Sequence, residues 1–208
     1  MPSVPKQLGR YKIVEAIGKG GMGYVYQGWD PGFDRKVAIK TIALDKLSKE
    51  EAASLEARFR EEALAAGKLI HQRIVGVYDV GREGDIAYMV MELIDGEDLG
   101  HLLKSGEQFT LERVALVLQD LLEALNYVHE KAIVHRDIKP GNMLIDADGR
   151  VKLMDFGIAR IAGSRSKGLT TIGAPIGTFR YMSPEQMRGD KDVEHVAGIL
   201  GTLSLIHI

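Results

Sequence analysis

Residues 135–142 of the chain read His-Arg-Asp-Ile-Lys-Pro-Gly-Asn. Three side chains in this stretch offer different chemistry, because Lys139 follows Asp137 by two positions and Asn142 follows it by five. A carboxylate can accept a proton, a lysine can neutralise a phosphate group, and an amide oxygen can ligate Mg²⁺. A proline and a glycine interrupt regular structure and place the stretch in a loop. The sequence therefore predicts a loop that carries a base, a cation and a metal ligand.

The residues after this loop predict a β-hairpin that ends at a second acidic group. Strands are expected at residues 143–146 and 150–153, and Asp148-Gly149 between them is typical of a tight turn. Asp155-Phe156-Gly157 follows the second strand. Because Mg²⁺ prefers one or two carboxylates together with phosphate oxygens, an acidic side chain here suits a magnesium site beside phosphates.

The residues before the loop predict a long amphipathic helix. Thr110 has the hydroxyl of a helix N-cap, and apolar residues follow it at helical spacing. The predicted apolar stripe consists of Leu111, Val114, Leu118, Leu121, Leu125 and Val128.

The first third of the chain reads as short strands separated by glycine, proline and aspartate. The predicted strands cover residues 11–17, 24–29, 37–42, 74–80 and 86–91. One helix interrupts them. It begins with a capping-box pattern at Ser48 and Glu51, and its apolar face carries Leu55, Phe59, Ala66 and Leu69. The change of pattern at residues 92–96 predicts a sheet-rich lobe followed by a helical lobe.

Glu62 is a charged residue on the apolar face of that helix. A carboxylate in a stripe meant for burial is costly unless a cation or hydrogen bonds meet it. Lys40 is the expected partner, because strand alternation places it with Ala38 on one face of residues 37–42. Such a lysine would suit a planar ligand with a phosphate tail. The alternative is an edge lysine and a partly exposed glutamate.

Glycines recur at Gly18, Gly20 and Gly23, between two predicted strands. Glycine lets backbone N–H groups approach phosphate oxygens. A dinucleotide-binding site would need a helix after the glycines, and the Gly-Lys-Ser/Thr ending of a Walker loop does not occur in the sequence. The remaining interpretations are a phosphate-binding hairpin and a flexible hairpin turn.

Together, and in this order, these motifs resemble the protein kinase family over about residues 11–190. The resemblance includes Ser183-Pro184-Glu185 where the family has Ala-Pro-Glu, a departure of one residue. Lys139 and Gly177-Thr178 resemble serine/threonine kinases and not tyrosine kinases. The amino-acid sequences of residues 133–142 and 178–189 are most similar to those of bacterial eukaryotic-like serine/threonine kinases.

The resemblance implies an α+β fold with two lobes. A small antiparallel β lobe with one helix would occupy residues 1–94, and a partial, mainly helical lobe would occupy residues 95–190. The implied activity is transfer of the γ-phosphoryl group of ATP to serine and threonine hydroxyls of proteins, with Mg²⁺ as cofactor. Autophosphorylation of the loop between Asp155 and Ser183 is also implied, and two copies of the chain would pair for it.

The resemblance assigns ATP-binding roles to the residues that match the family's motifs. Gly18, Gly20 and Gly23 would cover the phosphates, and Lys40, held by Glu62, would bind the α- and β-phosphates. The adenosine contacts would come from Val25, Ala38 and Leu144 around the adenine, from the gatekeeper Met91, from the Glu92 carbonyl and the Ile94 amide, and from Asp98 at the ribose.

Catalytic and regulatory roles are assigned in the same way. Asp137 would accept the proton of the substrate hydroxyl, Lys139 would neutralise the transferring phosphoryl group, and Asn142 and Asp155 would bind Mg²⁺. Arg136 would bind a phosphate on Thr170 or, slightly less favoured, on Thr171; the alternative is that both threonines are ordinary loop residues. The weaker modification candidates are Ser164 and Ser166, and the remaining residues of the activation-loop and substrate region are Thr178 and Glu185.

The composition of the 208 residues narrows the function classes further. With 27 basic and 29 acidic side chains the net charge is −2, which argues against binding to nucleic acid or anionic lipid. The absence of cysteine excludes disulfides, thiolate metal sites and cysteine nucleophiles, and it fits a reducing compartment. We expect a cytoplasmic chain without a secretory leader or membrane segment, from a parent protein that a membrane could anchor.

The end of the chain departs from the family pattern. The resemblance stops near Asp190, and Gly198 stands where an aspartate is expected, so the sequence predicts a C-terminally truncated kinase with an aberrant tail at residues 191–208. Residues 203–208 match one reading frame of a transposon end used in sequencing adapters, and we expect them to be adapter-derived. The coding nucleotides decide this, since other codons would remove the interpretation.

Two other functions compete with an active protein kinase. One is a truncated or pseudokinase-like module that binds nucleotide or a partner without turnover, although Lys40, Asp137, Asn142 and Asp155 are all present. The other is a small-molecule phosphotransferase. That class would not be expected to carry the long stretch between Asp155 and Ser183-Pro184-Glu185, which suits a platform for protein substrates.

Overall fold

The computed structural model describes residues 5–19, 23–135 and 137–156. The chain divides into two compact units, with residues 1–68 and 76–94 in the first and residues 69–75 and 95–208 in the second. The sequence placed residues 69–75 in the first lobe, whereas the structure assigns them to the second unit.

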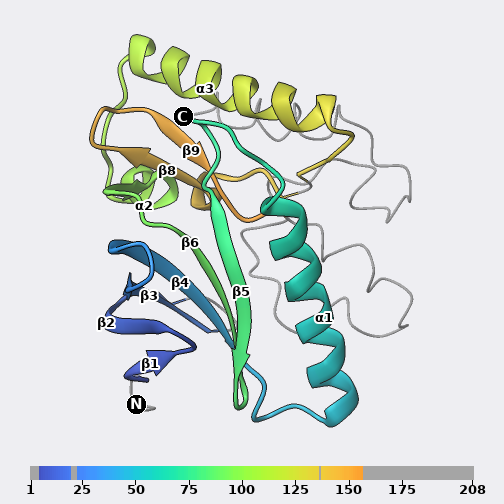
Figure 1. The fold of residues 1–208 in the computed structure, drawn as a ribbon. Coiled ribbons are helices and arrows are strands. Elements are labelled where there is room, and N and C mark those ends of the chain that lie inside the picture. The colour runs from blue at the N-terminus through green and yellow to red at the C-terminus, as the bar shows by residue number, and fades with distance from the viewer. Residues whose placement is uncertain (1–4, 20–22, 136, 157–208) are drawn as a thin grey trace. The chain divides into compact units, whose positions relative to one another are not determined.

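The first unit is built on a six-stranded antiparallel sheet in the order β1-β2-β3-β4-β6-β5 (Figure 1). The strands are β1 (Gln7–Leu8), β2 (Tyr11–Lys19), β3 (Tyr24–Asp30), β4 (Arg35–Ala43), β5 (Val77–Glu83) and β6 (Ile86–Glu92). Val37 and Ile39 of β4 are fully buried in a cluster with Tyr26 and Val90. Because side chains alternate along a strand, Ala38 and Lys40 lie on the opposite face of β4.

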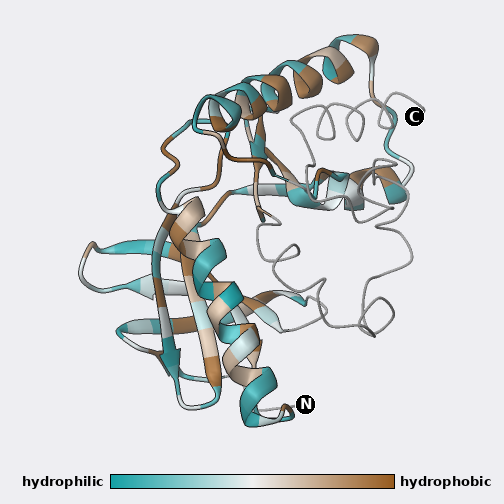
Figure 2. Ribbon diagram, turned by 90° about the vertical axis from the view of Figure 1, so that its right-hand side faces the viewer, coloured by the Kyte–Doolittle hydropathy of each residue, from teal (hydrophilic) through white to brown (hydrophobic). Residues whose placement is uncertain are grey.

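Helix α1 (Lys49–Ala66) packs against β5 within this unit. The predicted capping box is confirmed: the Glu51 N–H donates to Ser48 Oγ at 3.2 Å, and the Ser48 N–H donates to Glu51 Oε2 at 3.0 Å. Phe59, Ala63 and Ala66 are buried, while the remaining faces of the helix carry mostly hydrophilic residues (Figure 2). The apolar face is thus confirmed for Phe59 and Ala66.

The second unit combines helices with a small antiparallel sheet in the order β7-β8-β9. Its elements are β7 (Gly96–Asp98), α2 (Leu99–Lys104), α3 (Leu111–Glu130), the 3₁₀ turn η1 (Pro140–Asn142), β8 (Met143–Asp146) and β9 (Val151–Leu153). The predicted hairpin at residues 143–153 is confirmed, and Gly149 takes a φ of +75° in its turn. The α+β fold class predicted from the sequence is therefore confirmed.

Helix α3 begins at the predicted N-cap, because Thr110 Oγ1 accepts a hydrogen bond from the Arg113 N–H at 3.2 Å. The predicted apolar stripe is right in the second half of the helix, where Leu121, Leu125 and Val128 are buried. It is wrong at the start, where Leu111 is 85% exposed. Among the described helices, none has the length and apolar character needed to cross a lipid bilayer.

The strand predicted at residues 74–80 begins and ends three residues later in the structure, since β5 runs over Val77–Glu83. The preceding residues pair with β9 instead: the Leu153 N–H donates to the Arg73 carbonyl at 2.8 Å, and the Val75 N–H donates to the Leu153 carbonyl at 2.9 Å. Ile74 and Leu153 form a parallel bridge. Residues 74–76 therefore do not belong to β5, because this stretch pairs with Leu153, which is distant in sequence.

Candidate active site

Lys40 and Glu62 form an ion pair in the first unit. Lys40 Nζ lies 4.0 Å from Glu62 Oε1, and the two side chains are 27% and 17% exposed. Strand β4 supplies the lysine and helix α1 supplies the carboxylate. The structure therefore brings together the two charges that the sequence paired. Strand β4 lies between β3 and β6, so Lys40 is not on an edge strand, while Glu62 is partly exposed as the alternative expected.

The two described glycines of the predicted phosphate-binding segment have different surroundings. Gly18 pairs with Val25 across β2 and β3, and a Cβ built on Gly18 would make ordinary contacts with the Val25 side chain. A Cβ on Gly23 would overlap the Thr41 carbonyl oxygen. The close packing of the Gly23 backbone against the Thr41 backbone therefore requires a glycine at this position. This requirement is independent of any role of Gly23 in binding phosphates.

Other predicted adenosine contacts in the first unit lie on neighbouring strands. Ala38 of β4 pairs directly with Met91 of β6, and both are buried. Val25 pairs with Lys40 and is half-buried. The Glu92 carboxylate accepts a hydrogen bond from the Gly76 N–H at 3.2 Å, and Ile94 is the last residue of the unit.

Asp137 lies at the centre of a polar cluster in the second unit. Lys139 Nζ donates to Asp137 Oδ2 at 2.8 Å, and Asn142 Nδ2 donates to the same oxygen at 2.9 Å. The Asn142 amide also donates to the Asp137 carbonyl at 2.7 Å. Two donors on one carboxylate oxygen fix the orientation of the Asp137 side chain. The structure thus joins the three groups that the sequence predicted in one loop.

The amide of Asn142 is oriented so that its oxygen can serve a cation. Because its nitrogen is directed at Asp137, Asn142 Oδ1 points away from that residue. The Asn142 carbonyl accepts a hydrogen bond from the Met154 N–H at 2.9 Å, which places Asp155 one residue from this contact. A carboxylate and an amide oxygen on adjoining segments fit the oxygen ligands that Mg²⁺ prefers. Asp155 itself has a φ of +57°, a left-handed conformation that is uncommon outside glycine.

His135 is a buried, uncharged support for this cluster. Burial lowers the pKa of His135 to about 4, although the hydrogen bond to Met154 and the charges of Asp137 and Asp155 oppose that shift. The neutral ring accepts from the Asp137 N–H at Nδ1 (3.3 Å), so its Nε2–H donates to the Met154 carbonyl (3.0 Å). Its ring lies 4.6 Å from that of Phe156. His135 therefore ties the Asp137 loop to the segment that carries Asp155.

Asp98 and Leu144 face each other across β7 and β8. Asp98 Oδ1 accepts a hydrogen bond from the His101 N–H at 2.9 Å and so caps helix α2. This contact accounts for an aspartate at the position in structural terms. Leu144 is half-buried.

A model of the protein kinase domain matches residues 11–198 of the chain. The chain belongs to the protein kinase family. The family predicted from the motifs is thereby confirmed, and each cluster described above falls within the matched range.

Several bacterial kinases are similar to this kinase chain. It is 44% identical over 192 residues to "Probable serine/threonine-protein kinase SCO3848" of Streptomyces coelicolor, covering 90% of the chain and 28% of that relative. It is 42% identical over 185 residues to the serine/threonine-protein kinase PknB of Mycobacterium tuberculosis (87% and 29%). It is 40% identical over 181 residues to the serine/threonine-protein kinase PrkC of Bacillus subtilis (87% and 27%). The chain thus spans less than a third of the length of these relatives.

Sequence reasoning missed one charged cluster of the kinase, centred on Asp120 of α3. This carboxylate is 1% exposed and accepts hydrogen bonds from the Arg150 guanidinium and, at 2.9 Å, from the Val151 N–H. Arg73 Nε lies 3.1 Å from it without an aligned hydrogen bond, so that contact is ionic. The sequence did contain a signal for this cluster, because Asp120 is an acidic residue among the apolar positions of α3. Glu62 was identified from the same kind of signal on α1.

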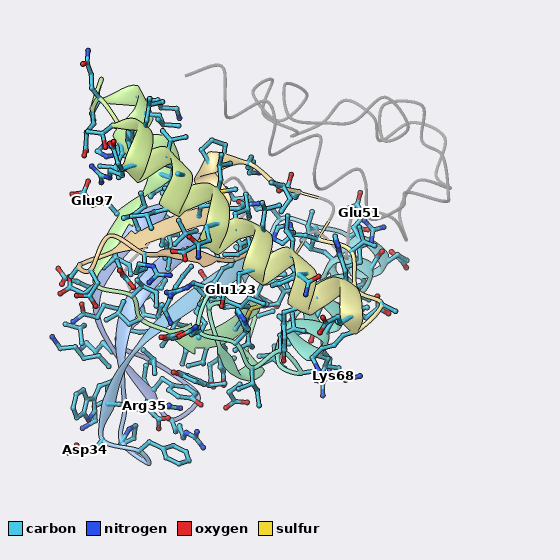
Figure 3. All side chains as sticks on the ribbon, turned by 90° about the horizontal axis from the view of Figure 1, so that it is seen from above. Asp34, Arg35, Glu51, Lys68, Glu97 and Glu123 are labelled. Carbon is cyan, nitrogen blue, oxygen red and sulfur yellow. The ribbon has the colours of Figure 1, made fainter. Side chains whose placement is uncertain are left out.

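Positive charges and hydrogen bonds around Asp120 compensate for the burial of its carboxylate. Burial alone would raise the pKa of Asp120, but the hydrogen bonds from Arg150 and Val151 and the positive charges of Arg73 and Arg150 outweigh it and lower that pKa. Glu123 (labelled on α3 in Figure 3) lies 3.9 Å from Arg73 and is 38% exposed. One buried and one partly exposed carboxylate therefore face the same arginine.

Some predicted site residues lie outside the described residues. They are Gly20 in the glycine segment, Arg136 in the loop, the modification candidates Ser164, Ser166, Thr170 and Thr171, the residues Thr178 and Glu185, and the tail at 191–208. Their roles stay predictions.

Proposed function

We propose that the chain is the catalytic part of a serine/threonine protein kinase that transfers the γ-phosphoryl group of ATP to hydroxyl groups of protein side chains. The observation that carries the proposal is the Asp137 cluster, in which a carboxylate, a lysine and an amide share one set of hydrogen bonds. The names of the bacterial relatives support serine and threonine as acceptors.

Asp137 acts as the base in this proposal. Its carboxylate accepts the proton of the substrate hydroxyl while that oxygen bonds to phosphorus and the bond to the ADP oxygen breaks. The hydrogen bonds from Lys139 and Asn142 hold the carboxylate in one orientation, so little reorganisation is needed during the reaction. Lys139 also places a positive charge next to the base, where the transferred group becomes more negative.

Lys40 binds the α- and β-phosphates of ATP in this proposal. Glu62 keeps the lysine extended from β4, since the two side chains lie within ion-pair distance. Gly18, Gly20 and Gly23 cover the phosphates, and the adenosine contacts are Val25, Ala38, Met91, Glu92, Ile94, Asp98 and Leu144. These roles follow the family's motifs.

Asn142 and Asp155 would hold Mg²⁺, which would neutralise charge on the phosphates. Asn142 contributes its amide oxygen, and its nitrogen remains on Asp137. The cofactors of the reaction are therefore ATP and Mg²⁺.

The partners follow from the same proposal. Protein substrates dock near Thr178 and Glu185, and a phosphate on Thr170 or Thr171 binds Arg136. Two copies of the chain pair for autophosphorylation. We place the chain in the cytoplasm, where ATP is available, and nucleic acid is not a partner because the net charge is −2.

Transfer of labelled phosphate from ATP to a generic basic protein tests the proposal. We expect transfer by the unaltered chain, with phosphoserine and phosphothreonine in the hydrolysed product. Asp137→Asn should lower the rate by about 10²-fold or more, because the base is lost while the shape is kept. Lys40→Met should abolish transfer.

Binding and turnover are separated by a thermal-shift measurement with ATP and Mg²⁺. A shift without transfer would identify a nucleotide-binding module instead of an active kinase. Equal transfer by the unaltered chain and Asp137→Asn would refute the role of Asp137.

A further inference from the structure

We propose that the Thr41 hydroxyl is a positioning group that fixes the backbone of Gly23 and Tyr24 and thereby strengthens binding of the phosphates of ATP. This inference rests on the proposed function, because it takes Gly23 to lie beside the bound phosphates. Thr41 follows Lys40 directly on β4 and is 6% exposed.

The Thr41 hydroxyl satisfies both backbone groups of Tyr24. The Tyr24 N–H donates to Thr41 Oγ1 at 3.2 Å, and the Thr41 hydroxyl donates to the Tyr24 carbonyl at 3.0 Å. A hydroxyl can do both because it has one hydrogen and two lone pairs. The backbone pairing of β3 with β4 reaches Val25 and Lys40, so the threonine side chain extends the connection by one residue.

The backbone of Thr41 also contacts Gly23. The close approach of Gly23 to the Thr41 carbonyl leaves no room for a Cβ on the glycine. Thr41 therefore contacts two successive residues where the chain enters β3. On the other side, Tyr24 pairs with Lys19 of β2.

Thr41 acts on the nucleotide through this backbone and not by contact. Strand alternation places its side chain on the face of β4 opposite to Lys40. A fixed Gly23–Tyr24 backbone loses less conformational freedom when phosphates bind, and that raises affinity without a new contact. The effect is confined to the phosphate part of the ligand, which gives the inference a specific test.

The test compares ATP with adenosine, which lacks phosphates. Thr41→Val keeps the shape and removes the hydroxyl, and Thr41→Ser keeps the hydroxyl as the matched control. We expect Thr41→Val to raise the dissociation constant of ATP with Mg²⁺ about tenfold, the size expected when the backbone of about one more residue must be ordered on binding. The dissociation constant of adenosine should change less than about twofold, and Thr41→Ser should bind both like the unaltered chain.

Amide hydrogen exchange measures the positioning without any ligand. In the unaltered chain the Tyr24 amide should exchange as slowly as the Val25 amide, and Thr41→Val should expose the Tyr24 amide selectively. Rapid exchange at Tyr24 in the unaltered chain would overturn the inference even if Thr41→Val does not fold.

The binding outcomes separate the two proposals. Equal weakening of ATP and adenosine in Thr41→Val, or no weakening, would refute the role of Thr41 while the proposed function stands. An unaltered chain that binds neither ligand would refute the proposed function, and the inference with it.

Discussion

His135 remains neutral at physiological pH because it is 1% exposed and its two ring nitrogens are engaged. Its pKa is about 4 in the folded chain against an ordinary value of 6.5. Between these values the unfolded chain binds a proton that the folded chain does not, so the free energy of unfolding falls as the pH is lowered from 6.5 to 4. The loss over this window should be about 3 kcal/mol.

Urea unfolding at pH 7 and at pH 4.5 measures this loss. His135→Gln is the comparison, because glutamine can donate and accept but does not titrate here. Its unfolding free energy should depend less on pH than that of the unaltered chain. Asp120, whose pKa lies below the ordinary 3.8, loses its contribution only under more acidic conditions and does not obscure the comparison. Identical pH profiles of the two chains would contradict the buried neutral state of His135.

Gly23 and Gly18 should respond differently to alanine. Gly23→Ala places a Cβ against the Thr41 carbonyl, so the two strands must separate and the thermal midpoint should fall by several degrees. Gly18→Ala meets only the Val25 side chain at 3.6 Å and should change the midpoint little. Thermal unfolding of both variants tests this prediction. Equal midpoints for Gly23→Ala and Gly18→Ala would show that the Gly23 and Thr41 backbones can separate without loss of stability.

At the scale of elements, a buried acid joins α3 to β9 and to residues 71–75. Asp120→Asn keeps an acceptor for the Val151 N–H but leaves Arg73 and Arg150 without their buried counter-charge. We expect the free energy of unfolding to fall by about 3 kcal/mol. Glu123→Gln removes a 38%-exposed carboxylate near the same Arg73 and should cost about 0.5 kcal/mol. Urea unfolding compares the two, and similar losses would mean that burial does not govern these ion pairs.

Local signals in the sequence predicted the elements whose ends are determined locally. The Ser48–Glu51 box, the Thr110 cap and the Asp148-Gly149 turn each depend on residues within four positions, and each is found in the structure. The short elements β1, β7 and α2 were not predicted, because two to six residues carry too little periodicity.

Contacts between distant residues limited the rest of the prediction. Arg73, Asp120 and Arg150 come together from three separate segments, and no spacing rule connects them. The strand expected from Ile74 starts later for the same reason, since Leu153 pairs with that stretch. For the candidate site, the Lys40–Glu62 pair was predictable because one partner was a charge on an apolar helix face. Thr41 gave no such signal, because threonine is ordinary in a strand.

At the scale of the whole molecule, activity should depend on phosphorylation of the chain itself. Arg136, next to the proposed base, is expected to bind a phosphate on Thr170 or Thr171 through charge-assisted hydrogen bonds. Phosphatase treatment should therefore lower phosphate transfer to a generic substrate. A chain carrying Thr170→Ala and Thr171→Ala should start at the low rate and not respond to phosphatase. Unchanged transfer after complete dephosphorylation would exclude this form of control.

The backbone passes between the two compact units three times, at residues 68/69, 75/76 and 94/95. A protease that cuts once near residue 95 would release an N-terminal fragment that still contains residues 69–75, the strip that pairs with Leu153. The C-terminal fragment would lack that strip and lose Arg73, one of the two arginines that contact Asp120. Dividing the gene at residue 94/95 would therefore keep every residue of the first unit on one product but leave the second unit without residues 69–75.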